Sequence, residues 1–170
     1  MLNSKLKMKK FAIEIKWGIR YFFAYLLWVY LEKMSGYYSE KIDDYLMYSM
    51  LFYFIAIFIY VLAINDKKKN YFNNVMDWKQ GSVTGIFMTI VIAILMPLCQ
   101  IVVHKGMAPE FFPNMIENSV SKGTRLEDAK AFFNLSSYIF QSIFSALSFG
   151  VVISAIVAYF LQTKNLKKQQ

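Results

Sequence analysis

The sequence YLMYSMLFYFIAIFIYVLAIN, which runs from Tyr45 to Asn65, decides the fold class because it is apolar and carries no charged residue. A helix needs about 20 mostly apolar residues to cross a lipid bilayer, and this stretch is long enough. Two other uncharged stretches have the same character, one at residues 81–103 with Pro97 inside it and one at residues 138–161. We therefore expect an integral membrane protein whose spanning segments are helices.

A fourth span is expected at residues 11–32, although it is less regular because it contains Glu14, Lys16 and Arg20. A cleaved signal peptide is the alternative, but Trp28 and Leu31 stand where small residues should mark a cleavage site. The sequence thus predicts an all-α fold with a single membrane domain over residues 1–170. Its four transmembrane helices form an antiparallel bundle and are expected at residues 11–32, 45–65, 81–103 and 138–161.

The distribution of basic residues predicts the orientation of this bundle. Hydrophobic residues make up 57% of the chain and charged residues 18%, and the formal net charge is +8. Cytoplasmic segments of membrane proteins carry an excess of Lys and Arg, so both termini and the loop between the second and third spans are expected in the cytoplasm. The same asymmetry explains the net charge with the lipid bilayer as partner and without nucleic acid. These segments hold 12 of the 19 basic residues, namely Lys5, Lys7, Lys9, Lys10, Lys16, Lys67, Lys68, Lys69, Lys79, Lys164, Lys167 and Lys168.

The loop between the third and fourth spans, residues 104–137, is expected to hold two short amphipathic helices on the outer surface. Pro109 is placed to begin the first helix and Gly123 to end it. Thr124 and Glu127 match the spacing of a capping box, which predicts the start of the second helix. The two helices would form either a lid on the bundle or an interfacial anchor.

Small residues recur at every fourth position of the third and fourth spans. Such ladders let two helix backbones approach closely in lipid, where packing drives association. We expect the two spans to contact each other within one chain, with Ile92 facing the lipid. The ladder residues are Gly81, Gly85, Thr89, Ala93 and Pro97 in the third span, then Ser142, Ala146, Gly150, Ser154 and Ala158 in the fourth.

The first two spans carry aromatic stripes with polar atoms instead of small residues. We expect either a packed bundle interior whose hydroxyls reach neighbouring carbonyls, or a groove lined for a ligand. The stripes are Trp17, Tyr21, Tyr25, Trp28 and Glu32 in the first span, then Tyr45, Ser49, Tyr53, Ala56 and Tyr60 in the second.

Polar residues also gather where the third span ends and the fourth begins. If the ladders face each other, these residues meet and form either a hydrogen-bonded seal or a small polar pocket. The cluster consists of Gln100, His104, Asn134, Tyr138 and Gln141.

Two charged residues of the first span need separate explanations. Arg20 is the deepest charge, and it either extends to the cytoplasmic headgroups or pairs in the bundle interior. Glu14 lies four residues after Lys10, which favours an ion pair along one helix.

Signatures of known chemistry are absent from the sequence. It contains no H-E-x-x-H, G-x-S-x-G or P-loop motif. The chain has one His and one Cys, Cys99, so a His/Cys metal site is not expected. We therefore predict no catalytic residue, no metal, no cofactor and no enzymatic activity.

Seven strings along the chain carry a family resemblance: KKFAIEIKWG (9–18), YLEKMSG (30–36), YVLAINDKKKN (60–70), WKQGSVTG (78–85), PLCQ (97–100), AFFNLSSYIFQ (131–141) and SAIVAYF (154–160). In their order and spacing they resemble a bacterial family of small four-helix membrane proteins, the domain of unknown function 4199 family. The resemblance covers nearly the whole chain. It implies this fold and a location in the bacterial cytoplasmic (inner) membrane, but it brings no activity and no functional residue.

Two functions of different classes fit these observations. The first is a non-enzymatic scaffold or accessory subunit of a membrane or envelope complex, whose partner is a membrane protein or a second copy of the chain. The alternative is a small oligomeric transporter or channel. The small-residue ladders, the two helices of the outer loop and the absence of catalytic motifs favour the first, while the alternative has no obvious coupling carboxylate and only Arg20 as a deep charge.

Overall fold

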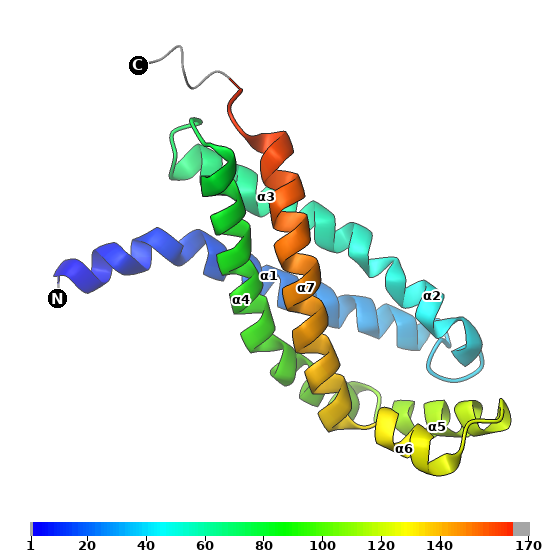
Figure 1. The fold of residues 1–170 in the computed structure, drawn as a ribbon. Helices are drawn as coiled ribbons and strands as arrows, with labels where there is room; N and C mark the ends of the chain where they lie inside the picture. Colours follow the sequence, from blue (N-terminus) through cyan, green and yellow to red (C-terminus); the bar gives the residue numbers. More distant parts are fainter. Residues whose placement is uncertain (1, 165–170) are drawn as a thin grey trace.

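The computed structural model describes residues 2–164, with side chains from Phe11 onward, and these residues form helices and no strand. This confirms the all-α class (Figure 1). The predicted cytoplasmic lysines at 167 and 168 lie outside the described residues, as do the side chains at 5, 7, 9 and 10. In chain order the elements are α1 (Leu2–Met34), η1 (Ile42–Asp44), α2 (Tyr45–Met50), α3 (Phe52–Asn70), α4 (Trp78–Ile101), η2 (Val102–Met107), α5 (Phe111–Ser121), α6 (Leu126–Phe132) and α7 (Leu135–Leu161).

Three segments are long and apolar enough to cross a membrane: Ile42–Asn70, Trp78–Met107 and Leu135–Leu161. They contain the spans expected at 45–65, 81–103 and 138–161. The first includes both α2 and α3, because the single residue between them, Leu51, keeps a helical backbone (φ −63°, ψ −24°). Helix α1, which covers the span expected at 11–32, is not among the segments that are long and apolar enough by the same measure of length and composition.

The helices form two hairpins that cross each other. Figure 1 shows α1 running antiparallel to α2 and α3, and this pair crosses the pair formed by α4 and α7. Helix α4 contacts α1, α3 and α7, and its contact with α7 is the most extensive in the described chain. The core therefore lies around α4, between the two hairpins.

Polar contacts close the end of the bundle where α3 turns into α4. The backbone amide of Thr163 donates to the carbonyl of Met76 at 2.8 Å, which fixes the end of α7 beside this turn. Lys67 of α3 forms an ion pair with Glu14 of α1 at 2.8 Å, and both side chains are only 3% exposed. The side chain of Lys10, the partner expected for Glu14 along α1, lies outside the described residues, and the described partner of Glu14 comes from another helix.

The first turn of α4 is fixed by a capping box that the sequence analysis did not identify. The Asp77 carboxylate accepts from the Gln80 amide at 2.7 Å, and the Gln80 side chain accepts from the Asp77 amide at 2.9 Å. The capping box expected at Thr124 and Glu127 is absent, because α6 begins one residue later, with Arg125 at its N-cap and no side-chain cap. Helix α5 ends at Ser121, two residues before Gly123, whose φ is +95°.

Small residues bring α4 and α7 into direct contact. A Cβ atom added at Gly85 would lie less than 3.0 Å from the side chain of Ser154, and one at Gly150 would overlap Thr89 in the same way. One at Gly81 would meet the methyl of Ala158 at 2.9 Å. The two ladders therefore face each other within one chain.

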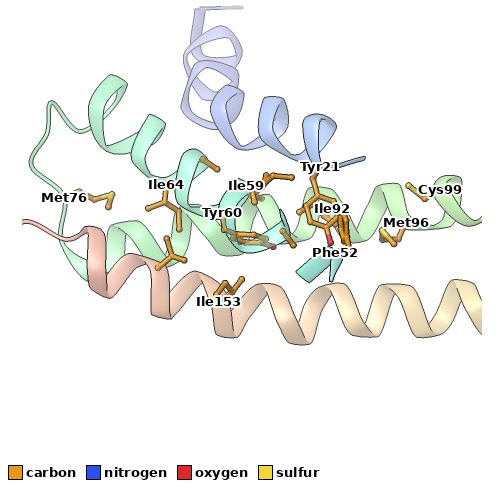
Figure 2. Close-up of a cluster of buried hydrophobic side chains, with 14 residues drawn as sticks. Tyr21, Phe52, Ile59, Tyr60, Ile64, Met76, Ile92, Met96, Cys99 and Ile153 are labelled. Atoms are coloured by element: carbon orange, nitrogen blue, oxygen red, sulfur yellow. The ribbon is translucent and has the colours of Figure 1, made fainter. Parts of the chain in front are cut away.

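A hydrogen-bonded chain crosses the centre of this contact. The Thr89 hydroxyl donates to the carbonyl of Gly85 at 2.9 Å and lies 2.7 Å from the Tyr60 hydroxyl. Because a threonine hydroxyl has one proton to donate, Tyr60 is the donor to Thr89. Figure 2 shows Tyr60 of α3 between α4 and α7, surrounded by apolar side chains such as Ile64 and Ile153.

Ile92, expected to face the lipid, is instead 3% exposed and belongs to the buried core (Figure 2). Helix α4 is covered on several sides, so its apolar residues do not all point outward. Ile94 is 70% exposed and is the most exposed isoleucine of this helix.

We expect the replacements Gly85→Leu and Gly150→Leu to lower the free energy of unfolding by about 1–3 kcal/mol each, because a branched side chain cannot fit at a direct helix contact. Ile94→Leu is the control, and we expect it to be neutral because that side chain is exposed. Thermal unfolding in mild detergent measures the effect. Equal stability of all three variants would show that the α4–α7 contact tolerates larger side chains.

Candidate functional site

A cavity of about 430 Å³ lies between the two hairpins. This is within the size range of pockets that bind small molecules. Its walls are mostly aromatic and aliphatic, with a few polar groups. The lining residues are Tyr21, Tyr25, Trp28, Glu32, Tyr45, Leu46, Ser49, Met50, Phe52, Tyr53, Tyr60, Ile92, Met96, Gln100, Met115, Phe132, Phe133, Tyr138, Gln141, Ser142, Ser145, Ala146 and Phe149.

The carboxylate of Glu32 is the charged group of this cavity. Its side chain is 2% exposed and accepts three hydrogen bonds, from the Trp28 indole at 2.8 Å, the Tyr38 hydroxyl at 2.9 Å and the Ser49 hydroxyl at 2.5 Å. Burial raises the pKa of Tyr38 well above its usual range, so this hydroxyl keeps its proton and stays a donor. All three donors are neutral, and they orient the carboxylate without supplying a positive charge.

A second polar group lies on the α4 side of the cavity. The side-chain oxygen of Gln100 is 3.0 Å from Nε2 of His104, and Gln100 lines the cavity together with Tyr25. Because a carbonyl oxygen only accepts, His104 carries its proton on Nε2. His104 lies in the π-helical turn η2, and its other ring nitrogen, Nδ1, is buried without a hydrogen-bond partner.

Helix α5 closes the end of the bundle beside this histidine. Phe111, the first residue of α5, is fully buried, and its ring centre lies 5.0 Å from those of Tyr45 and His104 and 4.7 Å from that of Tyr38. Lys33 connects α5 to α1 through an ion pair with Glu110 at 2.8 Å. We call this group of aromatic rings the aromatic cap.

The mouth of the cavity is defined by the lining residues that remain exposed. They come from α2 and the first turns of α3 on one side, and from α6 and the first half of α7 on the other. The cavity therefore opens between these two elements, on the flank of the bundle and not at its end. The exposed lining residues are Leu46, Met50, Tyr53, Phe132, Gln141 and Ser145.

The structure brings together only part of the polar cluster suggested by the sequence. Gln100 and His104 share a hydrogen bond, and the Tyr138 ring meets the His104 ring edge-on at 5.4 Å. Asn134 caps the start of α7 by accepting from the Ser137 amide at 3.0 Å, so its hydrogen bonds are local. Gln141 is exposed at the mouth of the cavity.

The remaining site residues from the sequence lie in two places. In the register of the contacts at Gly81, Gly85 and Gly150, Ala93 comes opposite Ala146 and Pro97 opposite Ser142, and both α7 residues line the cavity. Arg20 is exposed, and its guanidinium lies 4.5 Å from the ring centre of Trp17. This agrees with extension along the helix surface and not with pairing in the interior.

The place of Glu32 in a cavity was not predicted from the sequence, although this residue belongs to the aromatic stripe of the first span. The stripe itself was the available signal, because four of its members, Tyr21, Tyr25, Trp28 and Glu32, line the cavity. They border a cavity, which is what the groove that the sequence left open as an alternative requires. Among the described residues, no group of three His, Cys, Asp or Glu side chains is arranged to hold a metal ion.

Comparison with known proteins gives a family and nothing closer. A family model described as "Protein of unknown function (DUF4199)" matches residues 16–163, which confirms the resemblance seen in the sequence. No curated protein and no solved structure matches the chain.

We expect Gln100→Leu to cost about 1–3 kcal/mol of stability, because it removes the partner of His104 and leaves a second buried nitrogen unsatisfied. Gln141→Leu should be neutral, since Gln141 is exposed and makes no side-chain hydrogen bond in the described part of the chain. The double variant should equal the sum of the single effects. Unfolding in mild detergent measures the stability of all three variants. Non-additive effects would show that Gln141 interacts with the Gln100–His104 pair, which would contradict its separate place at the mouth of the cavity.

Proposed function

The chain belongs to the DUF4199 family of proteins of unknown function, and we propose that it is a non-enzymatic, four-span membrane protein that binds a small molecule in the cavity between its hairpins. The observation that carries this proposal is the cavity itself. Apolar walls with a few convergent polar groups are typical of sites that bind small ligands. The Trp28 indole and the Ser49 hydroxyl hold the Glu32 carboxylate in place, which supports a site built to bind.

The exposed face of α1 supports its role as the fourth span. An apolar side chain points outward at every fourth position of this helix, and each is more than 40% exposed. Exposing this apolar stripe to water would cost free energy, whereas a helix surface that faces lipid is expected to be apolar. Arg20 beside Trp17 fits the interface, where long basic side chains reach the headgroups. The stripe consists of Ile15, Ile19, Phe23, Leu27 and Leu31.

The cavity also bears on the two functions that the sequence suggested. A scaffold or accessory subunit needs contact surfaces but no internal cavity, so that role stays a prediction. A small oligomeric transporter is the second candidate, and Glu32 favours it, because a buried carboxylate in a cavity is the kind of coupling group that a transporter uses.

The proposed orientation places both termini on the cytoplasmic side of the bacterial inner membrane. Lys67 and Lys68 of α3 contact Glu14 and the carbonyl of Leu161, so the lysine-rich loop and the end of α7 lie at the same end of the bundle. An even number of spans requires this arrangement.

Reporter fusions test the topology. Fusions after Lys69 and after Gln170 should report a cytoplasmic location, because both follow lysine-rich segments, and a fusion after Lys122 should report an external one. An external signal at Gln170 would mean an odd number of spans and would contradict the fourth span at α1.

Binding of an apolar probe tests the cavity. We expect the full chain in lipid nanodiscs to bind the neutral fluorophore N-phenyl-1-naphthylamine saturably, and Ser145→Trp to abolish this binding by obstructing the mouth. Ser148→Trp is the matched control, because Ser148 is an exposed serine of the same helix that does not line the cavity. Equal saturable binding by both variants would place the probe elsewhere and would contradict the proposed function.

A further inference from the structure

We propose that the cavity selects organic cations with bulky apolar groups, such as lipophilic amines or quaternary onium ions, an inference that rests on the proposed ligand-binding function. Two independent features of the lining carry it. One is the unbalanced charge of Glu32, and the other is the aromatic surface around it.

The charge balance of the cavity is negative. Among the described residues that line it, Glu32 is the only charged side chain. Lys33, its neighbour in sequence, is turned away, since it pairs with Glu110 and donates to the carbonyl of Met107 at 2.5 Å. The partners of Glu32 are an indole and two hydroxyls, so the carboxylate is held in place but not neutralised.

A second buried carboxylate of the same chain shows the contrast. Glu14 is 3% exposed and pairs with Lys67, which is the usual arrangement for a buried charge. Glu32 is equally buried, yet no ion pair in the described part of the chain includes it. A cationic ligand in the cavity would complete the pairing that the chain itself omits.

The aromatic lining favours the same sign of charge. A cation is attracted to the face of an aromatic ring, most strongly to Trp and Tyr, and aromatic cages recognise quaternary ammonium groups in this way. Trp28 holds the Glu32 carboxylate with its indole N–H, and its ring stacks on Tyr48 at 5.1 Å. Tyr25, Tyr45 and Phe52 line the cavity close to this group. The same surroundings would repel an anion.

The size and shape of the site agree with a bulky ligand more than with a metal ion. A cavity of about 430 Å³ with mostly apolar walls leaves a small hydrated cation with few ligands. Apolar groups on the ligand would instead fill the space among Met96, Phe149 and Ile92, while the charged centre lies near Glu32. The inferred ligand is therefore amphipathic.

The test uses two ions of the same shape and opposite charge, tetraphenylphosphonium and tetraphenylborate. Each is titrated against the neutral fluorophore bound to the full chain in nanodiscs, with Ser145→Trp protein giving the background from lipid. After this correction we expect tetraphenylphosphonium to compete at least about tenfold better than tetraphenylborate, which corresponds to about 1.4 kcal/mol. Equal competition by the two ions would overturn the charge selectivity.

Glu32→Gln then assigns the selectivity to this residue. We expect the variant to lose about tenfold or more in affinity for tetraphenylphosphonium while it still binds the neutral fluorophore, which also shows that the cavity has formed. Glu117→Gln, at an exposed position of α5 outside the cavity, is the control and should behave as the wild type. Should Glu32→Gln fail to fold, the comparison of the two ions on wild-type protein decides the inference alone.

The outcomes separate the two proposals. Saturable fluorophore binding without preference for the cation would leave the ligand-binding function standing and overturn the cation inference. A cation affinity that persists in folded Glu32→Gln protein would also overturn it. If the wild-type protein shows no saturable fluorophore binding that is lost in Ser145→Trp, both the ligand-binding function and the cation selectivity are overturned.

Discussion

The close approach of helices at small residues in one half of the bundle is the constraint on which the rest of the structure depends. Gly85 and Gly150 let α4 and α7 touch, and Gly18 lets α1 touch α4 at Val91. Beyond Gly18 the core-facing residues of α1 are large, beginning with Tyr21 and Tyr25. Helices that meet at glycine and continue with tyrosine must separate along their length. The bundle is therefore tightly packed in one half and hollow in the other.

This gradient of side-chain size also explains where the polar groups lie. In the packed half, the hydroxyls of Thr89 and Ser154 bond to backbone carbonyls of their own helices, at Gly85 and Gly150. In the hollow half, Glu32 and Gln100 come from different hairpins and both line the same cavity. Burying a polar group in an apolar interior costs free energy unless the group is hydrogen-bonded. Here neighbouring hydroxyls and the indole of Trp28 supply hydrogen bonds to the buried polar groups.

The sequence predicted features that depend on one helix at a time. The three uncharged spans and the two ladders are periodic patterns within single segments, and their contact required only that the two helices be adjacent. Other contacts between residues of different helices could not be predicted. Glu14 pairs with Lys67 of another helix, and Ile92 is buried because α4 has neighbours on more than one side. The capping box at Asp77 and Gln80 was local and could have been found, whereas the one expected at Thr124 did not form.

The candidate site follows the same division. The aromatic stripe containing Glu32 was visible in the sequence. Whether it forms a packed interior or lines a cavity depends on whether side chains of a neighbouring helix fill the space in front of it. The aromatic cap decides how that space is reached, because Phe111 is fully buried among Tyr38, Tyr45 and His104 and closes the end of the bundle. The remaining opening lies on the flank, between α2–α3 and α6–α7. In the proposed topology that flank faces the hydrocarbon region and its interface, so a ligand would enter from the lipid phase. Apolar groups are then required for entry, and the charge of Glu32 acts on molecules that the membrane has already concentrated.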